Sequence, residues 1–106
     1  MNTLTEAQRD RVLAMLRELV RECDRHEVPV SLCGEMAGTP LEAMALLGVG
    51  FRILSMTASS VGPVKMMVRS LHLAPLEQFL ATLDTSPDHS LRAKLSAFAQ
   101  DHNVVI

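Results

Sequence analysis

The sequence predicts an α/β fold in which two parallel strands are joined by a helical crossover. Two apolar segments of strand length, residues 27–33 and 51–56, alternate with segments of helical periodicity. Residues 40–47 lie between them and have helical character, as the connection between parallel strands requires. Hydrophobic residues make up 48% of the 106 residues, so the chain has material for the core of one domain at most.

The N-terminal part, residues 3–26, is predicted to form one amphipathic helix. Thr3 and Glu6 have the spacing of a capping box, which favours a helix start there. The polar face carries charges of both signs, which is typical of a solvated surface rather than a basic binding patch. The apolar residues at helical spacing predict one buried stripe: Val12, Met15, Leu16, Leu19, Val20 and Cys23.

The first strand is predicted over residues 27–33, with Pro29 near its start, where a missing N–H is tolerated. The crossover helix over residues 40–47 begins with Thr39 as a cap and Pro40 at the first helical position. It ends at glycines, as helix C-termini often do. The second strand covers residues 51–56.

Three more helices are predicted after the second strand, over residues 59–71, 75–83 and 87–101. The first of them carries Pro63 in its opening turn and Ser60 as its expected cap. Its two methionines, Met66 and Met67, are expected to pack into the core, and Lys65 to be a surface charge. The last helix is expected to start at Ser86-Pro87.

Two strands do not complete a parallel sheet. Parallel sheets are normally covered on both faces and contain more than two strands. Residues 1–106 are therefore expected to be an incomplete domain, a portion of a larger α/β protein.

Composition and charge exclude several classes of function. A net charge of −2 and an aromatic content of 3% argue against nucleic acid as a partner. No apolar run is long enough to span a membrane, and the polar start lacks the pattern of a signal peptide, so a cytoplasmic location is expected. The two cysteines fit a reducing compartment, and the four scattered histidines define no metal site.

The chemistry is concentrated in the segment from Ser31 to Pro40. Cys33 falls where the first strand ends, and Gly34 and Gly38 permit a tight turn and close approach of a ligand. A helix follows directly, and its N-terminus favours anions. Ligands of parallel α/β folds bind at the carboxyl ends of strands. The alternative is a buried structural cysteine beside a glycine-rich turn.

Glu35, in the same loop, either orients Cys33 or touches the ligand loop; the alternative is a hydrogen bond to neighbouring backbone only. Ser55, Ser59 and Ser60 lie at the end of the second strand, on the side of the sheet where ligands bind. Met36 and Met56 lie beside the two strand ends and are expected to line a pocket, to form a subunit contact or to fill the core.

These motifs resemble a known family. Cys33-Gly34-Glu35-Met36-Ala37-Gly38-Thr39-Pro40, together with Leu46-Leu47-Gly48-Val49-Gly50, Leu54-Ser55-Met56, Ser59-Ser60 and Val64-Lys65, is similar to the C-terminal part of enzyme I. Enzyme I is the phosphoenolpyruvate–protein phosphotransferase of the bacterial phosphotransferase system. The ending from His89 to Ile106 is closer to its nitrogen-related paralogue. The resemblance covers residues 10–106.

The resemblance implies a fold and a reaction. The family's phosphoenolpyruvate-binding domain is a (β/α)8 TIM barrel, and this chain matches its last two strands with their flanking helices. In the family the phosphoryl group passes from phosphoenolpyruvate to a histidine on another domain and then to a carrier protein, which is phosphorylated on histidine. Cys33 matches the cysteine that protonates the enolate to give pyruvate, and a partly buried, protonated thiol suits that task. Gly34 and Glu35 match the substrate-binding loop.

The resemblance also implies what must come from elsewhere. The phosphorylated histidine, the substrate-binding arginines and the two carboxylates that bind magnesium match no segment here, so the fragment alone is expected to be inactive. A homodimer is implied, because the family dimerises through this domain. Thr39 departs from the aspartate that the family often has at this position.

Two alternatives remain open at this point. A relative such as pyruvate phosphate dikinase or phosphoenolpyruvate synthase also has a Cys-Gly pair on a late barrel strand, although the Glu-Met-Ala-Gly continuation favours enzyme I. A non-enzymatic dimerisation or interaction module is the alternative from a different class.

Overall fold

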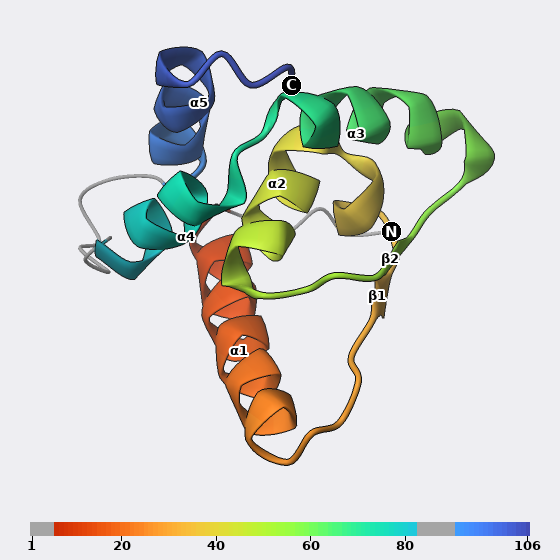
Figure 1. Cartoon of the computed structure of the whole chain (residues 1–106), viewed down its shortest axis with the longest axis vertical. Coiled ribbons are helices and arrows are strands. Elements are labelled where there is room, and N and C mark those ends of the chain that lie inside the picture. Colours follow the sequence, from red (N-terminus) through yellow and green to blue (C-terminus); the bar gives the residue numbers. More distant parts are fainter. Residues whose placement is uncertain (1–5, 83–90) are drawn as a thin grey trace.

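The computed structural model describes residues 6–82 and 91–106. The predicted cap Thr3 and the predicted helix start Ser86-Pro87 lie outside these residues. The order of elements follows the predicted one, with an added 3₁₀ turn (Figure 1): α1 (Glu6–Arg25), β1 (Leu32–Cys33), η1 (Met36–Gly38), α2 (Pro40–Val49), β2 (Leu54–Ser55), α3 (Ala58–Ser70), α4 (Leu73–Thr82) and α5 (Leu91–Asp101).

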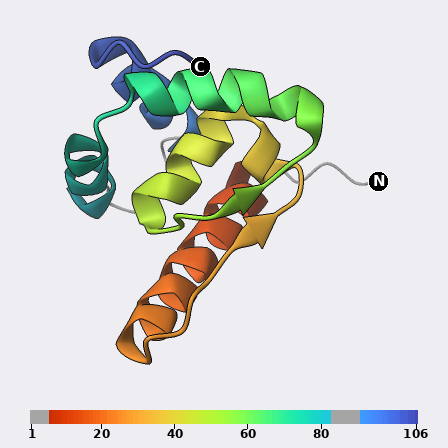
Figure 2. The ribbon, with the colours of Figure 1, turned by 45° about the vertical axis from the view of Figure 1, so that its right-hand side comes forward.

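The crossover helix α2 is the centre of the structure. It contacts α1, α3, α4, α5 and η1 (Figures 1 and 2). An α-helix that is apolar all round must be covered on all sides, and the sequence of α2 is of this kind. Five of its residues are buried: Leu41, Ala43, Met44, Ala45 and Leu46.

The two strands are parallel, as predicted, but much shorter than the predicted segments. Leu32 pairs with Leu54 and Cys33 with Ser55. The predicted strand over residues 27–33 forms only at its end, because α1 closes with Glu27 in a left-handed conformation (φ 56°) and no second partner strand lies nearby among the described residues. The Val28 amide donates to the Cys23 carbonyl (2.8 Å) and the Glu27 amide to the Asp24 carbonyl (3.2 Å), the pattern of a Schellman motif.

Helix α1 forms as predicted, but it buries a narrower face than the predicted stripe. Leu13 and Val20 are buried, whereas Met15 is 71% and Leu19 48% exposed. The prediction was wrong for these two residues because α2 and α5, which contact α1, cover only one side of it. Met15 and Leu19 therefore form an uncovered apolar face.

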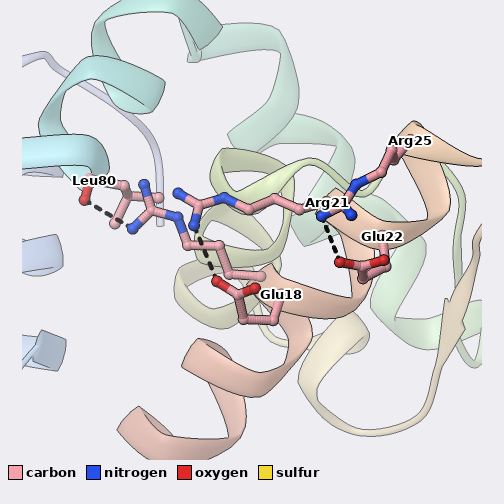
Figure 3. Close-up of polar contacts among 6 residues, drawn as sticks. Glu18, Arg21, Glu22, Arg25 and Leu80 are labelled. Carbon is pink, nitrogen blue, oxygen red and sulfur yellow. Dashed lines mark hydrogen bonds and ion pairs between the residues drawn. The ribbon is translucent and has the colours of Figure 1, made fainter.

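The polar face of α1 carries mixed charges, as predicted. Arg21 pairs with Glu18 at 3.0 Å and Arg25 with Glu22 at 2.7 Å, each one helical turn apart (Figure 3). Arg17 instead reaches the neighbouring helix and donates to the Leu80 carbonyl at 3.3 Å (Figure 3). These charged side chains therefore bond to other residues of the same chain.

Helix α3 corrects three predictions. It begins at Ala58 with Thr57 as its N-terminal cap residue, so Ser60 is inside the helix rather than at its cap. Pro63 consequently lies inside α3 and not in its first turn. Met67 is fully buried, as predicted, but Met66 is 53% exposed. Neighbouring residues on a helix point about 100° apart, so only one of the two methionines faces the core.

One face of the small sheet is open. Leu32 and Leu54 pack against the core, whereas Ser31, Cys33, Ile53 and Ser55 are exposed. Side chains alternate between the two faces of a strand, so these four exposed residues share the face that no described element covers. In residues 6–82 and 91–106, no helix combines the length and the apolar character that crossing a bilayer requires.

Candidate functional site

Cys33 is the last residue of β1, and it is exposed on the open face of the sheet. Its register partner is Ser55, the last residue of β2. Because paired residues of parallel strands present their side chains on the same face, the thiol and the Ser55 hydroxyl belong to one edge of the sheet, at the carboxyl ends of both strands. The alternative of a buried structural cysteine is therefore wrong.

Gly34 turns the chain away from the sheet directly after Cys33. Its φ of 131° lies in a region that residues with a side chain rarely adopt, and nothing lies within 4 Å of the position that a Cβ would occupy. Glycine is therefore required here for backbone conformation and not for space.

Replacing Gly34 with alanine is expected to destabilise the chain by about 1–2 kcal/mol, because the backbone would be strained. Gly62 is the matched control. A Cβ added there would also have nothing within 4 Å, but Gly62 lies in α3 without a positive φ, so Gly62→Ala is expected to stabilise by about 0.5–1 kcal/mol. Urea unfolding followed by circular dichroism measures both. Equal effects of the two substitutions would contradict the role assigned to the Gly34 backbone.

The loop after Gly34 is held by its own backbone. The Gly38 amide donates to the Glu35 carbonyl at 3.1 Å, and the Thr39 hydroxyl donates to the same carbonyl at 3.2 Å. Thr39 is the residue before α2, as predicted, but its side chain bonds back into the loop instead of capping the helix. The Glu35 side chain is exposed, so the carbonyl rather than the carboxylate of Glu35 organises this turn.

A cluster of hydroxyl groups follows β2. The Thr57 hydroxyl lies 3.3 Å from the Ser59 hydroxyl and 3.2 Å from the Ser60 hydroxyl. The Ser60 amide donates to the Thr57 carbonyl at 3.0 Å, which starts α3. Sequence reasoning singled out the two serines but missed Thr57. The signal that identifies it is a threonine placed between a strand end and the first helical residue.

The structure brings the two post-strand loops together. Turn η1 contacts β1, β2 and α3, so the loop after Cys33 lies against the loop after Ser55. Figure 2 shows the ends of both strands leading into neighbouring turns. Met36 and Met56, beside the two strand ends, are half-buried and pack against the core. Lys65, which follows Ser60 further along α3, is exposed.

Charged and metal-binding groups are sparse around this site. No group of three or more His, Cys, Asp or Glu side chains among the described residues is placed to hold a metal ion. Magnesium prefers carboxylate oxygens together with substrate phosphate, and Glu35 is the one carboxylate in the loop between Cys33 and α2. The described residues around Cys33 therefore do not make a magnesium site.

Comparison with known proteins places these elements in a family. Residues 2–73 match the model of the PEP-binding domain of PEP-utilising enzymes, PEP being phosphoenolpyruvate. A relative from Escherichia coli, named "Phosphoenolpyruvate-dependent phosphotransferase system", is 36% identical over 91 residues, which cover 82% of this chain and 12% of the relative. No solved structure matches the chain.

Other relatives carry the name "Phosphoenolpyruvate-protein phosphotransferase". One from Cupriavidus necator is 41% identical over 66 residues, covering 62% of this chain and 11% of the relative. One from Chlamydia trachomatis is 36% identical over 61 residues, covering 58% of this chain and 11% of the relative. The chain thus spans about one eighth of the length of these curated relatives. The matched family model covers the sheet, the Cys33 loop and the hydroxyl cluster, and the chain belongs to the family of PEP-utilising enzymes, in their PEP-binding domain.

Proposed function

We propose that this chain is the portion of a phosphoenolpyruvate–protein phosphotransferase that carries the proton donor for pyruvate formation. The observation that carries the proposal is the position of Cys33. It ends a parallel strand, lies on the open face of the sheet and falls within the segment that matches the PEP-binding family. The carboxyl ends of parallel strands are where such folds place their chemistry.

In the proposed step, the P–O bond of phosphoenolpyruvate breaks, the phosphoryl group goes to a histidine on another domain, and an enolate remains. The Cys33 thiol gives its proton to C3 of the enolate, which yields pyruvate and leaves a thiolate. Water reprotonates the thiolate before the next turnover. A proton donor must be fixed within reach of the atom that it protonates, and the end of β1 fixes the Cys33 backbone.

The rest of the machinery comes from outside this chain in this proposal. The phosphoacceptor histidine, the arginines that bind substrate and the magnesium carboxylates belong to other segments, so residues 1–106 alone are inactive. Gly34 and Glu35 contact the substrate. The partners are phosphoenolpyruvate, pyruvate and a carrier protein phosphorylated on histidine, in a cytoplasmic homodimer. The pattern of residues 89–106 supports the nitrogen-related branch.

We further propose that the two strands belong to a (β/α)8 barrel, with residues 1–106 as its C-terminal portion. A complete barrel takes about 250 residues. Two features of the structure support this assignment. The sheet has an uncovered face that includes the apolar Ile53, and α1 has an uncovered apolar face at Met15 and Leu19. Both are surfaces that neighbouring strands and helices of a barrel cover.

Ile53 offers a test of the barrel assignment. It is 55% exposed, so Ile53→Ala is expected to change the stability of the isolated chain by about 0.5 kcal/mol or less. In a complete barrel the same side chain is buried, and the substitution is expected to cost about 1 kcal/mol or more. Thermal unfolding of both proteins, each with and without the substitution, makes the comparison. A similarly small effect in the complete protein would contradict the barrel assignment.

A chimera tests the proposed function. It also serves as the complete protein in the Ile53 comparison. In it, residues of this chain replace the segment that they match in the Escherichia coli relative. The chimera is expected to form pyruvate from phosphoenolpyruvate in the presence of the carrier protein and magnesium. The unmodified relative is the positive control, and a version lacking the segment is the negative control. A folded but inactive chimera would overturn the proposal.

The alternative function is a non-enzymatic dimerisation or interaction module. The uncovered residues Met15, Leu19 and Ile53 are the observation that favours it, because exposed apolar surface promotes association. A folded, inactive chimera together with self-association of the isolated chain in sedimentation would support this alternative instead.

A further inference from the structure

Gly38, at the end of η1, meets the hydroxyl cluster at very short range. A Cβ added at Gly38 would lie 2.9 Å from the Ser60 hydroxyl oxygen and 3.2 Å from the Ser60 Cβ. The φ of Gly38 is not positive, so its backbone conformation is open to alanine. An alanine at position 38 would therefore force the Ser60 side chain or the 3₁₀ turn to shift, so the limit here is space, whereas at Gly34 it is backbone conformation.

The sequence alone suggests that Gly38 makes room for a ligand, but the structure fills that room with Ser60. The Ser60 hydroxyl is itself 3.2 Å from the Thr57 hydroxyl, so it is tied to the start of α3. The contact between Gly38 and Ser60 thus joins the turn after β1 directly to the first turn of α3, the helix that follows β2.

The Gly38 side of this contact is connected to Cys33 by a short, bonded path. The Gly38 amide donates to the Glu35 carbonyl at 3.1 Å, and Thr39 reinforces the same carbonyl at 3.2 Å. Glu35 is two residues from Cys33, and η1 also contacts β1. We therefore expect a displacement of η1 away from Ser60 to move the end of β1 as well.

We propose that Gly38 is a positioning residue, whose close contact with Ser60 sets where the Cys33 loop lies relative to the end of β2. The role deepens the proposed function and rests on it, since Cys33 is the group that is positioned. Gly38 itself touches neither substrate nor a reacting atom in this proposal.

The test uses a size exchange across the contact. In the Cys23→Ser background, Cys33 is the one remaining thiol of the chain. Gly38→Ala is expected to change the rate constant for the reaction of Cys33 with a small neutral disulfide by about threefold or more, because the rate depends on the local environment of the thiol. The amide NMR signals of Cys33 and Gly34 are expected to shift with it. The double variant Gly38→Ala/Ser60→Gly is expected to restore both readouts, with Ser60→Gly alone as the reference.

Gly48 supplies a matched control on the other side of the core. A Cβ there would collide with Leu80 and Leu76 of α4, so Gly48→Ala also strains the packing of α2. It is expected to lower stability while leaving the Cys33 rate and the Cys33 amide signal unchanged. A purely structural role for Gly38 predicts that the two glycine variants behave alike.

The outcomes separate this proposal from the proposed function. An unchanged Cys33 rate and unchanged amide signals in Gly38→Ala would overturn the positioning role. If Gly38→Ala does not fold, recovery of folding in the double variant supports the contact, and no recovery refutes it. These readouts need no phosphotransfer. If the chimera is inactive, but Gly38→Ala changes the Cys33 rate and the double variant restores it, the proposed function alone is overturned.

Discussion

Cys33→Ala in the chimera is expected to lower the rate of pyruvate formation by about 10²–10⁴-fold, the usual contribution of a general acid. Alanine has no proton to give, so water must protonate the enolate instead. The end of β1 does not hold that water next to C3. The substitution removes one exposed sulfur atom and leaves no cavity, so the folded structure should be unaffected. Steady-state assay of pyruvate, with the KM for phosphoenolpyruvate measured alongside, checks the prediction.

Cys23 is the matched control for this experiment. It lies in α1, half-buried and outside the loops that follow the strands. Cys23→Ala is therefore expected to leave pyruvate formation unchanged. Cys33→Ser replaces the thiol with a hydroxyl of similar size, which is a much weaker acid. Its rate of pyruvate formation is therefore expected to be close to that of Cys33→Ala. Turnover in Cys33→Ala close to that of the unsubstituted chimera would remove Cys33 from the mechanism.

Phe51→Ala is expected to destabilise the isolated chain by about 3–5 kcal/mol, which is the cost of deleting a buried phenyl ring and leaving a cavity. Phe51 is 1% exposed, and its amide donates to the Leu46 carbonyl at 3.1 Å, at the end of α2. It therefore fixes the path from the central helix into β2. Small domains have about 5–15 kcal/mol of stability in total, so the variant should be largely unfolded in mild urea.

The control for Phe51 is Ile53, two residues further along the same segment. Ile53 is apolar and β-branched but lies on the open face of the sheet, so Ile53→Ala should shift the urea midpoint of the isolated chain very little. Urea titration by far-ultraviolet circular dichroism compares the two. A loss of less than about 1 kcal/mol for Phe51→Ala would mean that the core described around α2 does not carry the fold.

Much of the site follows from local sequence. The helix start at Pro40, the glycines after Cys33 and the two apolar segments predict a cysteine at the end of a parallel strand, and the structure confirms that placement. These features are local because caps, turns and crossover helices depend on neighbouring residues. Contacts between the loops after the two strands were beyond such reasoning. Nothing in the sequence indicates that Gly38 lies against Ser60, 22 residues away.

The errors in predicted burial and in predicted strand length have one physical cause. Met15 and Leu19 fit a buried stripe by spacing, and Met66 fits a core position by its chemistry, yet all three are exposed. Periodicity indicates which side chains are able to be buried together, whereas burial itself requires a neighbouring element on that side. The predicted strands failed in the same way, since β1 and β2 extend only where each has a partner.

The sequence by itself determined the type and order of the helices and strands, the parallel crossover and the place of Cys33 at a strand end. Each of these is fixed by residues close together in the chain. The tertiary structure alone decided that α2 is the central helix, that Cys33 and Ser55 share an open face, and that Gly38 abuts Ser60. These depend on which elements pack together, because burial and close contact arise between distant segments and not within any one of them.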